Sequence, residues 1–118
     1  MVHYTEIITE ETDAHCATLT AVHGLAFGEP VADLGFARVA TAPNGALIGV
    51  RKPLAAHETP IVRTYLAVED IHAAVRTAEA AGALVAYGPA QQGETGTWAI
   101  TMQGGVQMGL WQAGPADP

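Results

Sequence analysis

The chain has 118 residues, enough for one domain, and 49% of them are hydrophobic, enough to build a core. Its net charge of −7, from five basic and twelve acidic side chains, argues against nucleic acid or an anionic membrane as a partner. The start is too polar for a secretory signal, no apolar run reaches the roughly 20 residues that cross a bilayer, and Cys16 is the only cysteine. We therefore expect a cytoplasmic protein.

The first half of the chain predicts a strand, a helix and three further strands. An extended run at 3–9 leads into a helix over 11–24, and the strand candidates follow at 26–33, 36–42 and 46–52. Asn44-Gly45, a strong hairpin signal, separates the last two strands. Thr12 or Asp13 is the candidate N-cap of the helix, and Gly24 stands at its end.

The second half repeats this order after a linker at 53–60. An extended run at 62–69 precedes a helix over 69–82, and the three strand candidates lie at 84–91, 97–103 and 106–112. Asp70 is the predicted N-cap, Gly82 the predicted terminal glycine, and Gly104-Gly105 the hairpin turn. Apolar residues at three- and four-residue spacing give this helix one buried stripe: Ile71, Ala74, Val75, Ala78 and Ala81.

This repeated βαβββ order resembles the vicinal oxygen chelate superfamily, the glyoxalase, bleomycin-resistance and extradiol-dioxygenase group. The resemblance covers nearly the whole chain and is clearest at "VEDIHAAVRTAEAAGA", residues 68–83, and "GTWAITMQGGVQMGLWQ", residues 96–112. It implies an α+β fold in which two βαβββ modules form a curved mixed sheet around a cleft, with the helices on the outer face. It also implies a homodimer. We expect one domain over 1–114, with modules at about 1–52 and 61–113 and a tail at 115–118.

Strand alternation sorts the side chains into two faces. The mainly apolar face, with Met108 and Leu110 in the last strand, should pack on the helices. The opposite face mixes aromatic, polar and glycine residues, which is typical of a ligand cleft. The residues assigned to it are Gly49, Arg51, Arg63, Tyr65, Gln107, Gly109 and Trp111.

The register of the first strand is ambiguous, because Ile7 and Ile8 fall on opposite faces. The family pattern favours Tyr4, Glu6 and Ile8 in the cleft. A slip of one residue would place His3, Thr5 and Ile7 there instead.

The resemblance also implies where metal ligands would stand, since metal-dependent members take one ligand from the first and last strand of each module. Matched by position, these are Tyr4 (or His3), Gly49, Arg63 and Gly109. Glycine offers no side-chain ligand, and arginine repels a cation. We therefore predict that the family's metal site is absent and that the protein uses no cofactor.

Several cleft residues have two readings each. Gly49 and Gly109 leave room for a ligand, or else permit a bulge or close strand packing. Arg63 clamps an anion, or else forms a structural ion pair with Glu6. Trp98 and Trp111, with Tyr65, form a stacking wall for a planar ligand, or else pack in the core or a dimer interface. Arg51, near a strand end, is expected at the rim.

Three functions remain open from the sequence. The favoured one is binding of a small anionic or aromatic molecule without metal, as in the antibiotic-resistance members of the family. The second is an enzyme of isomerase or lyase type that uses Glu6 or Tyr4 as acid or base beside Arg63. A metal-dependent glyoxalase or dioxygenase is the third and least favoured. The sequence does not decide whether the protein is an enzyme.

Overall fold

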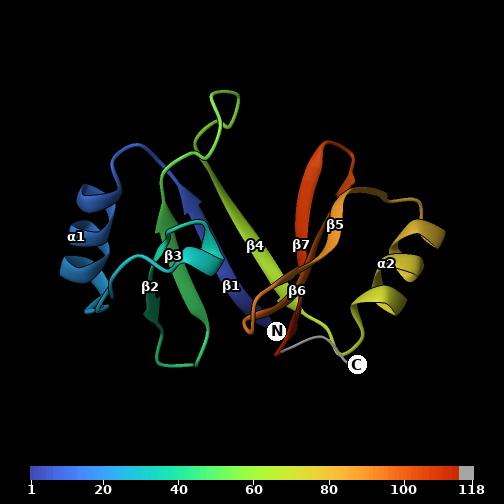
Figure 1. The fold of residues 1–118 in the computed structure, drawn as a ribbon, viewed down its shortest axis with the longest axis horizontal. Helices are drawn as coiled ribbons and strands as arrows, with labels where there is room; N and C mark the ends of the chain where they lie inside the picture. Colours follow the sequence, from blue (N-terminus) through green and yellow to red (C-terminus); the bar gives the residue numbers. More distant parts are fainter. Residues whose placement is uncertain (115–118) are drawn as a thin grey trace. The chain divides into compact units, whose positions relative to one another are not determined.

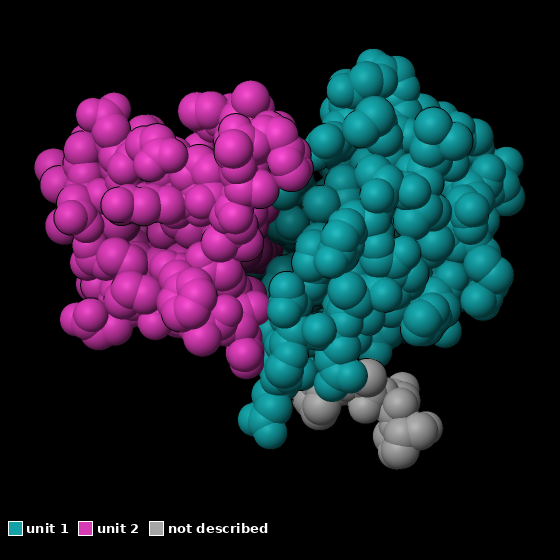
Figure 2. Space-filling model, turned by 45° about the horizontal axis from the view of Figure 1, so that its top comes forward, with its two compact units in different colours: residues 1–3, 63–118 teal, residues 4–62 magenta. Residues whose placement is uncertain are grey.

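A computed structural model describes residues 1–114, so the predicted tail at 115–118 lies outside the described residues. The fold is α+β, as predicted, with the βαβββ order complete in the second half of the chain and one strand short in the first half (Figure 1). The first three residues join the described residues from 63 onward in one compact unit, and residues 4–62 form the other (Figure 2). We call these the C-terminal and N-terminal modules. Neither described helix is long and apolar enough to cross a bilayer.

The N-terminal module contains β1 (Val2–Ile8) from Tyr4 onward, α1 (Thr12–His23), a short 3-10 helix at Ala32–Leu34, β2 (Arg38–Thr41) and β3 (Leu47–Arg51). β1 runs parallel to β3, and β2 pairs antiparallel with β3 through the Asn44-Gly45 turn. The strand predicted at 26–33 is wrong. That segment makes only isolated contacts beside β2. These are a Val31–Ala37 bridge and a hydrogen bond from Gly28 N–H to the Val39 carbonyl. Pro30, which has no N–H, stands in the middle of it.

The C-terminal module has the same topology with every strand formed. It contains β4 (Ile61–Ala67) from Arg63 onward, α2 (Ile71–Ala80), β5 (Leu84–Gln92), β6 (Gly96–Gln103) and β7 (Val106–Ala113). β4 runs parallel to β7, and β7, β6 and β5 pair antiparallel in that order. The Gly104-Gly105 turn joins β6 to β7, with positive φ at both glycines, as the hairpin prediction requires.

The ends of α2 agree with the sequence, whereas the start of α1 does not. Asp70 accepts a hydrogen bond from the Ala73 N–H at 3.1 Å, and Gly82, with φ of 102°, follows the last turn. The N-cap residue of α1 is Glu11, one residue before the first predicted candidate, Thr12. Glu11 makes no side-chain cap hydrogen bond. Thr12 and Asp13 lie inside the first turn, so neither caps the helix. Gly24 ends α1 in the left-handed conformation, as expected.

The two helices pack differently on their sheets. The predicted stripe of α2 is buried through Ile71 and Val75, which pack with Ala99 of β6. Val68, Val85 and Leu110 complete this cluster. α1 buries only Cys16, and burial raises the pKa of its thiol, so this cysteine acts as a packed apolar residue.

Candidate functional site

The sheet of the C-terminal module has one face toward α2 and one face away from it. Ala99 and Leu110 contact the helix, so their neighbours Trp98, Gly109 and Trp111 point the other way. This confirms the faces predicted for Leu110 and Trp111. The face of Trp98, which the sequence left open, follows from its pairing with Trp111 across β6 and β7.

Four aromatic side chains come together on the face away from α2. The ring of Tyr65 meets Trp111 edge-on at 5.5 Å between centroids and Trp98 edge-on at 6.1 Å. Tyr87 of β5 stacks on Trp98 at 4.7 Å with an interplanar angle of 6°. We call Tyr65, Tyr87, Trp98 and Trp111 the aromatic face. Both tryptophans of the chain belong to it.

The inner rings are fixed in place, and the outer ones are accessible. Tyr65 and Trp111 are 3% and 4% exposed, and the Trp111 indole N–H donates to the Thr95 carbonyl at 3.0 Å. Trp98 is half-buried, and Tyr87 is 54% exposed. A flat ligand would therefore contact the Tyr87–Trp98 pair, supported from behind by Tyr65 and Trp111.

Two members of this region were missing from the predicted site. Tyr87 lies in β5 where the pairing with β6 shifts register on either side of it, so simple alternation gave no signal. His3 enters the predicted site only as the alternative to Tyr4 in the first strand. Its ring lies 5.4 Å from that of Trp111, and burial lowers the pKa of its imidazole.

Polar groups occupy one end of the same face. Arg63 stands two residues before Tyr65 on β4, and Gln107 stands two residues before Gly109 on β7. The Arg63 Nε–H donates to the Gln107 side-chain oxygen at 3.1 Å, so the two predicted site residues are brought together. A guanidinium beside an aromatic wall can hold an anionic group while the rings hold an apolar body.

In the N-terminal module, the residues of the preferred β1 register share one face of the strand, and their place in a ligand cleft stays a prediction. Tyr4, Glu6 and Ile8 are all buried, and Glu6 lies opposite Gly49 in the β1–β3 pairing. Tyr4 reaches over Gly49, because a Cβ built there would overlap its phenol oxygen and lie 2.6 Å from Cζ.

Arg51 is not the rim residue that its place near a strand end predicted. It is 6% exposed, and its Nε–H donates to the Glu6 carboxylate at 3.0 Å. Its two terminal nitrogens donate to both oxygens of Glu58 at 2.8 and 2.9 Å. Burial alone would lower the pKa of Arg51, but the hydrogen bonds and charges of Glu58 and Glu6 outweigh it and raise the pKa above its ordinary value.

This ion-pair network ties Glu6 to a structural role. A carboxylate that accepts a hydrogen bond from a buried guanidinium is held in one orientation by that bond. That arrangement does not suit a residue that must take up and release a proton. The proposed pairing of Glu6 with Arg63 stays a prediction.

The two glycines of the predicted cleft do not leave open space. A Cβ at Gly109 would overlap the Tyr65 ring, just as one at Gly49 would overlap Tyr4. The observed arrangement is close packing of a tyrosine against each glycine. The alternative prediction, that the glycines leave room for a ligand, is wrong. Each glycine exists where a tyrosine of the neighbouring parallel strand crosses it.

No protein-family model and no curated protein matches the chain. Solved structures do. The methylmalonyl-CoA epimerase of Mycobacterium tuberculosis matches with a TM-score of 0.76 and 19% identity over 97% of this chain and 88% of that one. A hypothetical protein from Bacillus halodurans C-125 gives 0.73 and 12% over 100% and 97%. A variant of the Streptomyces coelicolor methylmalonyl-CoA epimerase with 2-nitronate-propionyl-CoA gives 0.68 and 16% over 95% and 96%.

The chain has the vicinal oxygen chelate fold. The metal that this fold holds in some members can be tested against the residues present. In each module the last-strand position is a glycine covered by tyrosine, and Arg63 is a permanent cation. These positions do not fit a divalent ion. Within residues 1–114, no group of three or more His, Cys, Asp or Glu side chains is placed to hold one.

Proposed function

We propose that this protein binds a small planar organic anion on the aromatic face of its C-terminal module, without a metal. The carrying observation is the convergence of Tyr65, Tyr87, Trp98 and Trp111 on one sheet face, with Arg63 at its end. Aromatic rings offer a ligand large apolar contact at low entropy cost, and the guanidinium fixes the position of its charge.

The spacing along the strands suggests the size of the ligand. Tyr87 pairs with Ile100, Ile100 with Gly109, and Gly109 with Tyr65, so Tyr87 lies in the row of Tyr65. Arg63 lies two residues before Tyr65, and two residues of strand span about 7 Å. The Trp98 row lies one such step further, at about 13 Å from the Arg63 row. A carboxylate carried on one or two fused rings fits this range.

Naphthalene-2-carboxylate is a suitable probe, because both tryptophans of the chain report on the proposed site. We expect it to quench the intrinsic fluorescence, and we expect Arg63→Gln to weaken its affinity about tenfold through the lost charged hydrogen bonds. Tyr87→Ala should weaken it several-fold. Lys52→Gln removes one positive charge from the N-terminal module and is the charge-matched control. Equal affinity in Arg63→Gln and Lys52→Gln, or no quenching at all, would refute the proposal.

Two of the matched structures are methylmalonyl-CoA epimerases, which supports a second candidate, an epimerase-like enzyme. Epimerisation at a carbon needs a base that removes a proton, and Glu6 is held by Arg51 instead. We therefore expect no exchange of the substrate α-proton when the protein is incubated with methylmalonyl-CoA in D₂O and followed by proton NMR. Exchange that disappears in Glu6→Gln would establish the enzyme. Homodimerisation and a cytoplasmic location also stay predictions, and native mass spectrometry would test the first.

A further inference from the structure

A cavity of about 400 Å³ lies in the N-terminal module, beside the end of β3. Its lining comes from the start of α1, from the turn before β2, and from β3 and the chain that follows it. We call it the Arg51 pocket. Neither Arg63 nor any residue of the aromatic face lines it, so its role is independent of the proposed function.

The pocket concentrates positive charge on an acidic protein. Arg38, Arg51 and Lys52 line it, so three of the five basic residues of a chain with net charge −7 lie around one cavity. Asp13 is the acidic residue of the lining, and it pairs with Arg38 in solvent. This excess of cations among the lining residues favours an anion as the occupant.

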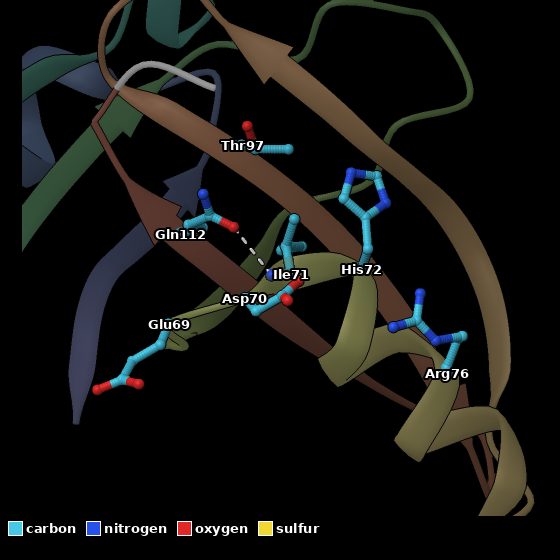
Figure 3. A pocket seen from close by; sticks show the side chains of 7 residues that line it. All are labelled: Glu69, Asp70, Ile71, His72, Arg76, Thr97 and Gln112. Atoms are coloured by element: carbon cyan, nitrogen blue, oxygen red, sulfur yellow. Dashed lines mark hydrogen bonds between the residues drawn. The ribbon is translucent and has the colours of Figure 1, made fainter. Parts of the chain in front are cut away.

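The C-terminal module has a pocket of similar size in which the cation is not anchored. It measures about 360 Å³ and opens at the start of α2, where the Gln112 side-chain oxygen accepts a hydrogen bond from the Ile71 N–H (Figure 3). The arginine of that pocket, Arg76, is exposed. Solvent and salt screen an exposed guanidinium, whereas a buried one is oriented and less screened. Of the two pockets, the one beside Arg51 is therefore the better anion site.

The buried guanidinium of Arg51 already holds a carboxylate that comes from the linker. Both oxygens of Glu58 accept from its terminal nitrogens, and one of them also accepts from the Leu54 N–H at 2.7 Å. This bidentate geometry is the one in which arginine recognises carboxylates in general. Segment 52–60 contains no helix or strand, and all its residues except Pro53 and Glu58 are exposed. Glu58 is thus the side chain that fastens an exposed segment to the module.

Two large apolar side chains stand exposed at the same pocket. Phe36 and Leu54 are 65% and 64% exposed, and both belong to its lining. The backbone of Phe36 has φ of 64°, a left-handed conformation that a bulky residue rarely adopts. A Cβ built at Gly35 would lie 3.1 Å from Arg51 Cδ and 3.2 Å from Leu54 Cδ1, so this turn and Leu54 both border the arginine. Strain of this kind concentrates at ligand sites, and here it holds an aromatic ring beside an anchored cation.

We propose that the Arg51 pocket binds a small carboxylate with an apolar tail, and that Glu58 closes the site by occupying the place of the ligand's carboxylate. The exchange replaces one bidentate carboxylate by another, so Arg51 keeps its hydrogen bonds and its charge stays compensated. The apolar tail gains contact with Phe36 and Leu54. Because Glu58 is tethered, it competes at a millimolar effective concentration, and binding of the ligand releases the linker.

The test is a titration with hexanoate at constant ionic strength, followed by ¹H–¹⁵N NMR. Hexanoate has no ring, so it does not match the planar ligand proposed for the aromatic face. We expect Glu58→Ala to bind it at least about tenfold more tightly than the parent, because the tethered competitor is gone. The shifts should centre on the amides of residues 35–38, 51, 52 and 54, and not on residues 71–73 beside the other pocket. Saturating the parent with hexanoate should also lower the heteronuclear NOE of residues 54–57, which reports release of the linker.

Asp13→Ala is the matched control, because it removes the same charge from the lining of the same pocket. Its affinity for hexanoate should stay within about twofold of that of the parent, since solvent screens an exposed charge. Phe36→Asn, made in the Glu58→Ala protein, should weaken binding several-fold through lost apolar contact, and asparagine tolerates the left-handed φ. If Glu58→Ala does not fold, Glu58→Gln keeps the shape of the side chain and should show a smaller gain in the same direction.

Hexanamide, which carries no charge, should shift none of these amides. Equal affinities of Glu58→Ala and Asp13→Ala for hexanoate would overturn the proposal. So would shifts centred outside the pocket, linker amides whose order is unchanged at saturation, or hexanamide binding as tight as that of hexanoate.

Discussion

The ion pair of the N-terminal module and the aromatic pair of the C-terminal module occupy equivalent positions. Glu6 lies opposite Gly49 in the parallel β1–β3 pairing, as Tyr65 lies opposite Gly109 in the β4–β7 pairing. Arg51 and Trp111 each follow two residues after the glycine. One topology thus supports a buried salt bridge in one copy and an edge-on aromatic contact in the other. In the N-terminal module the buried charges of Glu6 and Arg51 pair with each other. In the C-terminal module the aromatic face keeps an accessible ring, Tyr87.

The largest expected effect is on the ion pair. Arg51→Met should lower the free energy of unfolding by about 3–5 kcal/mol, because it leaves the Glu6 carboxylate buried without its cation. Urea unfolding followed by circular dichroism measures it. Adding Glu6→Leu should restore part of the loss, since that removes the stranded charge.

The control is Arg38→Met in the same module. Its pair with Asp13 is solvent-exposed, with the Asp13 side chain 93% accessible, and should contribute less than about 1 kcal/mol. If the two arginine variants lose equal free energy of unfolding, the buried network around Arg51 does not stabilise the fold more than an exposed ion pair does.

The next largest loss of stability is expected on substituting Gly49 or Gly109, and the two modules should differ in how the loss can be relieved. Gly109→Ala should destabilise the protein by about 1–3 kcal/mol, because the new Cβ meets ring atoms of the buried Tyr65. Tyr65→Phe should give no relief, since the contacts are with Cγ, Cδ2 and Cε2. In Gly49→Ala the nearest atom is the phenol oxygen of Tyr4, so Tyr4→Phe should relieve part of the loss.

A double-mutant cycle in each module measures this difference. Thermal or urea unfolding of the two single variants and the double variant gives the coupling free energy. A favourable coupling for Gly49 with Tyr4 and none for Gly109 with Tyr65 is the expected pattern. Gly45→Ala is no control here, because its positive φ adds backbone strain, whereas Gly28, with its Cβ position 3.8 Å from the nearest atom, is a suitable one.

Much of the C-terminal module could be predicted from the sequence, because local rules agree there. The stripe of α2, the Asp70 cap and the Gly104-Gly105 turn all act within a few residues. Alternation then placed Trp111 and Gly109 on the correct face. It failed for Tyr87, where the register of β5 shifts.

The N-terminal module depended on contacts distant in sequence. Arg51 pairs with Glu6, 45 residues away, only because β1 and β3 run parallel. Its second partner, Glu58, comes from the segment predicted as a linker, where nothing local indicates a role. A glycine in a strand signals either space or close approach, and only the position of Tyr4 or Tyr65 decides between them.

A smaller loss of stability is expected from the N-cap of α2 than from the glycines, and the N-cap of α1 gives the comparison. Asp70→Ala should lower the free energy of unfolding by about 1 kcal/mol, because it removes the hydrogen bond to the Ala73 N–H. Glu11→Ala, at the same position of α1, should have little effect, since Glu11 makes no side-chain cap. Urea unfolding of both variants checks this, and an equal loss in the two would contradict the assigned caps.

The smallest effect tests whether the aromatic face responds to pH through His3. Burial lowers the pKa of His3 in the folded protein, so the unfolded chain takes up the proton first as the pH falls through about 6.5. The stability of the parent should therefore decrease below that pH, relative to His3→Gln, by less than about 1 kcal/mol at this partly exposed ring. Unfolding of both proteins between pH 8 and pH 5 measures the difference.

His57→Gln, which replaces an exposed histidine of the linker, is the control. Its free energy of unfolding should change with pH as that of the parent does. A His3→Gln variant that also runs parallel would mean that packing beside Trp111 does not exclude the charged imidazole.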